Sequence, residues 1–345
     1  MEFRYRVKSN LIAVLSLLLF ILTATSSFAQ SDPFRIVTTT TQATDLMHIL
    51  TQNIPEDAIQ ITGLMGAGVD PHLYKPTVSD IEAMNEADMI IYSGLHLEGQ
   101  FGEVFESVSE RGVVIHRLSQ PIEDEGFVLK LEINGIVVDD PHFWFDPRNW
   151  ALVTSALAER LAELDPAHAD IYLANADAYI AQLELLHVWG VEAMSLVPEE
   201  LRYIVTSHDA FNYFGDAFGW TMVAIQGIST QDEAGVGDIQ GMVEFVIENN
   251  IPVIFVESSV PPTTIQAVQE AVINNGGTVE LGVRQLYSDA MGEPDTFGGT
   301  YIGMVAENIY TVLQSYHRAG IELSIPEWNE NISPIPPESL LTIEE

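Results

Sequence analysis

Short apolar segments alternate with helical segments along most of this 345-residue chain. Alternation of this kind predicts βαβ units and parallel sheets, and the length suits two lobes with separate cores. We therefore expect an α/β protein with two parallel-sheet lobes. The ranges that are typical of strands are 34–38, 58–64, 88–92, 112–117, 203–206, 253–257 and 278–286.

One long helical segment interrupts the alternation near the middle of the chain. A helix over 149–164 ends at Asp165, and this residue is expected to cap a second helix that begins at Pro166 or Ala167. About thirty residues would extend for ~45 Å, which is enough to contact both lobes. The apolar positions of this second segment recur close to a helical period: Ile171, Ala174, Ala178, Ala181, Leu185, Val188 and Met194.

The first residues have the pattern of a secretory signal peptide. Three basic residues precede an apolar run over 11–22 and a small-x-small cleavage site at 27–29. The run is shorter than the ~20 residues that a membrane-spanning helix needs. After residue 322 the chain is acidic and rich in proline, and is expected to be extended or loosely packed. The expected division is a signal peptide (1–29), an N-terminal lobe (30–165), a linking helix (166–196), a C-terminal lobe (197–330) and an acidic tail (331–345).

The composition narrows the possible chemistry. The chain contains no cysteine, which excludes disulfides, thiolate metal sites, thiol catalysis and a lipid-modified cysteine. The formal net charge of −37 disfavours nucleic acid and anionic membranes as partners. Adaptation to a salty medium explains most of this charge, which also raises the local concentration of cations. We expect a soluble protein in an exported space such as a periplasm.

Four side chains that can bind a metal ion are distributed along the chain: His72, His142, His208 and Asp289. They are separated by 70, 66 and 81 residues, whereas local metal motifs take neighbouring ligands from one helix or hairpin. Each follows a strand-like run, and the carboxyl ends of strands are where open α/β sheets bind ligands. Because two come from each half, the sequence predicts a site in the cleft between two lobes.

The local sequence around these residues supports a shared site. Two Asp-Pro-His triplets, at 70–72 and 140–142, place histidines in loops that proline stiffens. His208 directly follows a strand, and Asp289 lies in a Ser-Asp-Ala-Met-Gly segment. This joint pattern favours a metal site over isolated structural histidines. The remaining histidines are interpreted as structural or surface residues: His48, His96, His116, His168, His187 and His317.

Four acidic residues near the candidate ligands have open roles. Asp70, Asp140 and Asp209 either orient their neighbouring histidines or cap turns. Capping is favoured for Asp70 and Asp140, because Asp-Pro is a common turn opener. Glu257, at the end of the strand-like run 253–257, is either a supporting or alternative metal ligand, or a carboxylate that accepts backbone hydrogen bonds.

Over nearly all of its length after residue 29, the chain resembles the TroA-like family of metal-binding solute-binding proteins of ABC importers. That resemblance implies two α/β lobes joined by one long helix, with the metal between them and with His72, His142, His208 and Asp289 as ligands. It also implies that the protein is no enzyme, and that it is a periplasmic monomer that delivers Zn²⁺ or Mn²⁺ to an ABC permease and binds no nucleic acid. The segments that carry the resemblance are 37–39, 94–98, 208–214, 288–292 and 299–305.

The sequence leaves the choice of ion open. Zinc-dedicated relatives often carry a histidine-rich loop, whereas residues 121–140 contain no histidine. Manganese-dedicated relatives often place a carboxylate third among the ligands, where this chain has His208. Three imidazoles and one carboxylate suit Zn²⁺, and a bidentate Asp289 would accommodate Mn²⁺.

Two functions other than metal transport are alternatives. A zinc-dependent hydrolase could use the three histidines with water as the fourth ligand. Here a carboxylate takes the fourth place, and no general base accompanies it. Adhesion is a label that some relatives carry, but no residue of this chain points to it.

Overall fold

The computed structural model describes residues 32–133, 135–231 and 233–341. The division of the chain into two units falls between Pro33 and Phe34. Every helix and strand of the described residues lies in the second unit. The signal peptide expected over 1–29 lies outside the described residues.

The N-terminal lobe is built on a four-stranded parallel sheet with the strand order β2-β1-β3-β4. In β1, Ile36 pairs with Ile61 of β2 and with Met89 of β3, so the strand lies between two neighbours. The strands are β1 (Phe34–Thr38), β2 (Ile59–Gly63), β3 (Met89–Tyr92) and β4 (Val114–Arg117), and the helices are α2 (Thr41–Leu50), α3 (Val78–Glu86), α4 (Gly102–Glu110) and α5 (Gln120–Asp124).

The C-terminal lobe repeats this arrangement with shorter strands. Strand β7 pairs with β8, and β9 pairs with β10, both in parallel. These pairs form two separate two-stranded sheets, and the N–H of Phe255, the residue after β9, donates to the carbonyl of Val205 in β7 at 2.8 Å. The predicted α/β class with parallel sheets is therefore confirmed. The elements are β7 (Tyr203–Thr206), β8 (Thr221–Ala224), β9 (Val253–Ile254), β10 (Glu280–Leu281), α8 (Asn212–Phe218), α9 (Val236–Glu248) and α10 (Thr263–Asn274).

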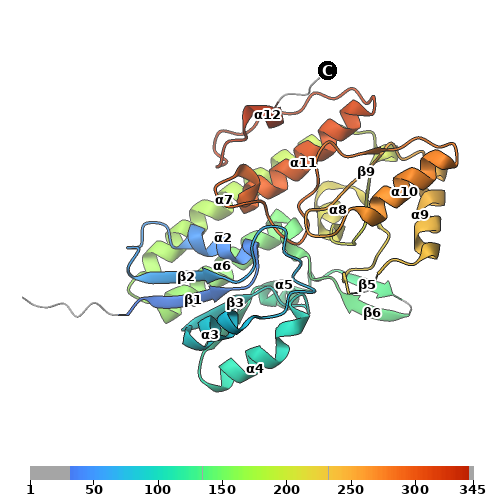
Figure 1. Ribbon diagram of the computed structural model, residues 1–345. Helices are drawn as coiled ribbons and strands as arrows, with labels where there is room; N and C mark the ends of the chain where they lie inside the picture. The colour runs from blue at the N-terminus through green and yellow to red at the C-terminus, as the bar shows by residue number, and fades with distance from the viewer. Residues whose placement is uncertain (1–31, 134, 232, 342–345) are drawn as a thin grey trace, which may run out of the picture. The chain divides into compact units, whose positions relative to one another are not determined.

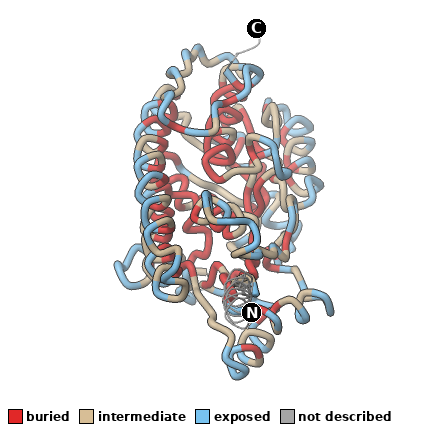
Figure 2. The backbone as a smooth tube through the Cα atoms, turned by 90° about the vertical axis from the view of Figure 1, so that its left-hand side faces the viewer, coloured by how far each residue is buried: buried red, intermediate tan, exposed pale blue. Residues whose placement is uncertain are grey.

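A long helix, α7 (Ala169–Met194), connects the two lobes (Figure 1). Its 26 residues correspond to a length of about 39 Å. It packs along α6 (Pro147–Leu164) and contacts α2 of the first lobe and α8 and α11 (Tyr301–Arg318) of the second. In Figure 2 the red, buried stretches of the backbone are concentrated in the middle of the view, and the pale-blue, exposed stretches lie mainly along its outer edges.

The buried face of α7 includes few of the periodic apolar positions of its sequence. Of those seven, only Met194 is buried, and Val188 is 64% exposed. The buried stripe includes Tyr172, Tyr179 and Trp189, whose large side chains gain much free energy from burial. Its members are Tyr172, Ala176, Tyr179, Leu183, Leu186, Trp189, Gly190, Ala193 and Met194.

The predicted N-cap of α7 is wrong. Asp165 is the C-cap residue of α6, and the N-cap position of α7 is occupied by His168 without a side-chain hydrogen bond. The carboxylate of Asp165 lies 2.6 Å from Nδ1 of His168 and accepts a hydrogen bond from the hydroxyl of Tyr172 at 2.9 Å. The Asp165 carboxylate therefore interacts with these two side chains, whereas a capping aspartate would accept hydrogen bonds from backbone N–H groups.

The sequence pattern did not predict an antiparallel hairpin formed by β5 (Lys130–Ile133) and β6 (Ile136–Asp139). The hairpin leads directly into the second Asp-Pro-His triplet. The strand predicted over 278–286 is also interrupted: β10 covers two residues, and pairing resumes only at an isolated bridge between Glu257 and Leu286.

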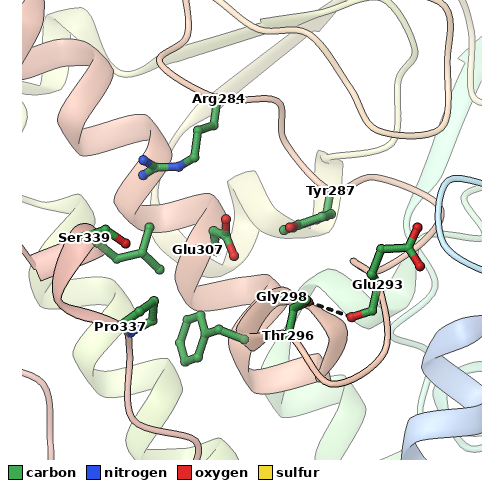
Figure 3. Close-up of a pocket in the computed structure, with 10 residues that line it drawn as sticks. Arg284, Tyr287, Glu293, Thr296, Gly298, Glu307, Pro337 and Ser339 are labelled. Atoms are coloured by element: carbon green, nitrogen blue, oxygen red, sulfur yellow. Dashed lines mark hydrogen bonds between the residues drawn. The ribbon is translucent and has the colours of Figure 1, made fainter.

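The segment after residue 322 is packed rather than loose. Ile332 and Leu340 are 1% and 3% exposed, and Gln314 of α11 donates to the carbonyl of Leu340. The segment ends in α12 (Glu338–Leu341). Pro337 and Ser339 lie across from Arg284 and Glu307 at a cavity of about 330 Å³ (Figure 3).

Within the described ranges, no helix combines the length and apolar character that crossing a membrane requires.

Candidate metal centre

The structure brings the side chains of His72, His142, His208 and Asp289 together. One ligand atom from each lies within 4.8 Å of those of the other three. His72 lies in the loop between β2 and α3, and His142 lies between β6 and α6. His208 is two residues beyond β7, and Asp289 follows the bridge at Leu286. Residues distant in the sequence therefore meet where loops of both lobes converge.

The three imidazole rings surround the Asp289 carboxylate. Their centroids are 5.0 to 5.5 Å apart in all three pairings. Oδ1 of Asp289 lies 3.3 Å from Nε2 of His142. Oδ2 lies 3.7 Å from Nδ1 of His208 and 3.9 Å from Nε2 of His72. Each imidazole thus turns a nitrogen toward the same carboxylate.

The atoms that face this centre are buried and lack hydrogen-bond partners. All four residues are at most 2% exposed. Within the described part of the chain, Nε2 of His72, Nε2 of His142, Nδ1 of His208 and Oδ1 of Asp289 have no hydrogen-bond partner. Buried polar atoms in proteins are nearly always satisfied, so four unsatisfied atoms that converge are suited to a cation.

The buried carboxylate of Asp140 fixes the orientation of His142. Oδ1 of Asp140 accepts the backbone N–H of His142 at 3.0 Å, as expected for a turn cap, but it also lies 2.7 Å from Nδ1 of the ring. Because a carboxylate only accepts, the neutral ring keeps its proton on Nδ1, and Nε2 then has the lone pair that a metal ion needs in place of a second proton. Burial lowers the pKa of His142, but Asp140 and Asp289 outweigh it and raise the pKa to about 10.

A different ring nitrogen of His208 faces the centre. Its Nε2–H donates to the carbonyl of Ile228 at 3.2 Å, so in the neutral ring that binds a metal ion the lone pair is on Nδ1. The backbone N–H of His208 donates to Oε1 of Glu257 at 2.8 Å, which is one of the roles expected for that glutamate. Burial opposes protonation of His208, but Asp289 and Glu257 outweigh it, and the pKa is raised.

The loop that carries His72 is held by residues of the other lobe. Asp70 accepts the backbone N–H of His72 at 2.8 Å, as predicted for a turn cap, and its other oxygen accepts the hydroxyl of Thr230 at 2.6 Å. Gln231 donates to the carbonyl of His72. Gly68 has a φ of +70°, a conformation that favours glycine, in the turn before the triplet. Burial lowers the pKa of His72 to about 3.

Asp289 is positioned from both lobes as well. The hydroxyl of Ser259 lies 3.4 Å from Oδ2, and Gln42 of α2 donates to the backbone carbonyl of Asp289 at 3.1 Å. Burial raises the pKa of Asp289, but the three imidazoles outweigh it, and the pKa lies well below its usual range.

Several residues that support the ligands were missed in the sequence. Asn212 donates to both Asp140 and Asp209, so Asp209 interacts with this amide instead of orienting His208. The supporting hydrogen bonds connect the two halves of the chain or two separate loops, and they come from Gln42, Asn212, Thr230 and Ser259. No local pattern marks such contacts. The six other histidines belong to no group of three or more potential ligands among the described residues.

Comparisons with known proteins agree with this architecture. Residues 36–315 match the family described as "ZnuA: Zinc-uptake complex component A periplasmic". The zinc-binding protein TroA of Treponema pallidum (strain Nichols) is 38% identical over 268 residues, covering 77% of this chain and 85% of that protein. The manganese-binding lipoprotein MntA of Bacillus subtilis (strain 168) is 36% identical over 289 residues, covering 81% and 89%. The solved structure of the periplasmic zinc-binding protein TroA from Treponema pallidum superposes with a TM-score of 0.76 at 37% identity, covering 82% and 99%.

The fold and these matches define the class: a metal-binding solute-binding protein of an ABC transporter, and not an enzyme. The chain belongs to the ZnuA family of periplasmic zinc-uptake components. The alternative of a zinc-dependent hydrolase is therefore not supported.

Proposed function

We propose that His72, His142, His208 and Asp289 bind one divalent metal ion as the transported cargo. The observation that carries this proposal is the convergence of four buried ligand atoms within 4.8 Å. Charge supports it as well, because Asp289 neutralises half of the charge of a divalent cation. Three imidazoles and a carboxylate match the donor set that Zn²⁺ prefers.

The cargo is Zn²⁺ or Mn²⁺. TroA of Treponema pallidum is a zinc-binding protein and MntA of Bacillus subtilis is a manganese-binding lipoprotein, and both are similar to this chain. Zn²⁺ binds more tightly than Mn²⁺ to most sites of this composition. Which ion is carried in the cell therefore depends on supply as well as on intrinsic affinity.

The protein acts as a monomer that delivers its ion to an ABC permease. Its lobes correspond to residues 30–165 and 197–330, with 166–196 as the linking helix. Hydrogen bonds between Asp70 and Thr230, and between Asp140 and Asn212, connect the lobes beside the ligands. Docking on the permease has to break such contacts for the lobes to separate and release the ion. The long α7 keeps this motion small.

The site of action lies outside the cytoplasm. The family is described as periplasmic, and the first 29 residues have the pattern of a cleavable signal. Because the chain has no cysteine, it lacks the thiol to which a lipid could be attached. The mature protein therefore moves freely in the exported space, where its negative charge attracts cations.

Calorimetric titration of the purified protein tests the proposal. With Zn²⁺ and Mn²⁺ titrated separately, the wild-type chain binds one ion, and His142→Ala loses binding of both. His48→Ala is the matched control, because His48 is exposed on α2 and belongs to no ligand group among the described residues. Unchanged affinity in His142→Ala would overturn the proposed ligand set.

A further inference from the structure

Glu257 presents a second buried carboxylate to the metal centre. It is 3% exposed and forms an isolated parallel bridge with Leu286. Its Oε1 accepts the backbone N–H of His208, whereas Oε2 has no hydrogen-bond partner among the described residues. A buried carboxylate oxygen that lacks a partner is costly. A cation beside Oε2 would remove that cost.

The position of Oε2 fits a metal ligand. It lies 3.5 Å from Nδ1 of His208, closer than the 3.7 Å between that nitrogen and Oδ2 of Asp289. Metal–ligand bonds of about 2.0–2.2 Å place neighbouring ligand atoms roughly 3.0–3.5 Å apart. Glu257 is outside the group of four whose ligand atoms lie within 4.8 Å of one another. Oε2 of Glu257 therefore lies on the His208 side of the centre, where it can serve as a further ligand beside the four principal ones.

Resting on the proposed function, we propose that Glu257 determines specificity by serving as an additional ligand for ions that prefer more than four ligands. Zn²⁺ is satisfied by four tetrahedral ligands, so the four principal side chains suffice for it. Mn²⁺ favours a larger sphere that is rich in oxygen. A second carboxylate supplies that oxygen, and together with Asp289 it neutralises a divalent ion. Glu257 thus sustains binding of Mn²⁺ more than binding of Zn²⁺.

The test compares the affinities of both ions in Glu257→Gln and in the wild type. The amide oxygen can still accept the N–H of His208, so the backbone anchor is retained. Glu257→Met is a second variant, because methionine has no side-chain N–H that could donate to Nδ1 of His208 and compete with the metal ion there. Both variants are expected to lose about tenfold or more in affinity for Mn²⁺ and less than about threefold for Zn²⁺. X-ray absorption at the manganese edge should show one oxygen ligand fewer in Glu257→Gln.

The remaining outcomes separate this inference from the proposed function. Equal losses for both ions, no loss, or a wild-type protein that binds only Zn²⁺ would overturn the role of Glu257 and leave the four-residue site intact. Failure of the wild type to bind either ion would overturn the proposed function, and the role of Glu257 with it. Thermal melting of the metal-free variants verifies that each one is folded.

Discussion

The carboxylate of Asp140 lies 2.7 Å from Nδ1 of His142, and both side chains are fully buried. This pair sets the tautomer of the ring and directs Nε2 toward Asp289. The same Asp140 accepts a hydrogen bond from Asn212 of the other lobe at 3.0 Å. The orientation of one candidate ligand is therefore coupled to contact between the lobes.

Removing the charge of Asp140 should weaken metal binding without removing a ligand. In Asp140→Asn, the amide no longer selects the Nδ1-protonated ring, and we expect a loss of about 10- to 100-fold in affinity. Titration calorimetry with Zn²⁺ measures the loss. Asp139→Asn is the control, because Asp139 is exposed and pairs with Lys130. Equal affinity of Asp140→Asn and the wild type would contradict the orienting role.

Bound metal should stabilise the fold by mass action. At a free ion concentration 1,000 times the Kd, the expected gain is about 4 kcal/mol in the free energy of unfolding. Thermal melting with Zn²⁺ and then with a chelator measures this gain as a rise of several degrees in Tm. His72→Ala should show no rise. A metal-dependent shift that persists in His72→Ala would point to another binding site.

A buried carboxylate should make the metal-free stability depend on pH. Burial raises the pKa of Asp45 to about 6, and the hydrogen bond from the N–H of Tyr301 only partly offsets this. Since the folded pKa exceeds the unfolded value, the stabilisation is complete below about pH 4 and is lost as pH rises through 6.

The variant Asp45→Asn tests that dependence. It cannot ionise, so its stability relative to the wild type should increase between pH 4 and 7 by about 1–2 kcal/mol. Denaturant unfolding in the presence of a chelator, at several pH values, measures the difference. A difference that does not vary with pH would refute the assignment.

The buried stripe of α7 can be tested by truncation. Leu183 is fully buried, so Leu183→Ala should lower the free energy of unfolding by about 2–5 kcal/mol. Val188 is 64% exposed, and Val188→Ala should change it by less than about 0.5 kcal/mol. Chemical denaturation compares the two. Similar losses in the two variants would contradict the packing of α7 through the face that carries Leu183.

The sequence predicted the features that depend on local pattern. The strand–helix alternation gave the α/β class, and the position of His208 directly after a strand matches β7. The helical period near 171–194 matches the helix α7. It does not identify the buried face, because apolar residues recur on the exposed side too, while Tyr172 and Tyr179 are buried.

Contacts between distant segments were beyond the reach of the sequence. For Asp140 the sequence leaves turn capping and orientation of His142 open and favours capping, whereas the structure shows both contacts. The contact with the ring depends on the rotamer that Asn212 and the loop impose, which no local pattern predicts. Packing of the segment after residue 322 was likewise unforeseen. A hydrogen bond from Gln314 to Leu340 and the burial of Ile332 have no local signature.

The most direct test of the metal centre is a crystal structure of the Zn²⁺-loaded protein with anomalous data at the zinc edge. The expected result is one strong peak about 2.0–2.2 Å from Nε2 of His72, Nε2 of His142, Nδ1 of His208 and an oxygen of Asp289. A loaded crystal with its zinc bound elsewhere, and with these four side chains free of metal, would contradict the assignment.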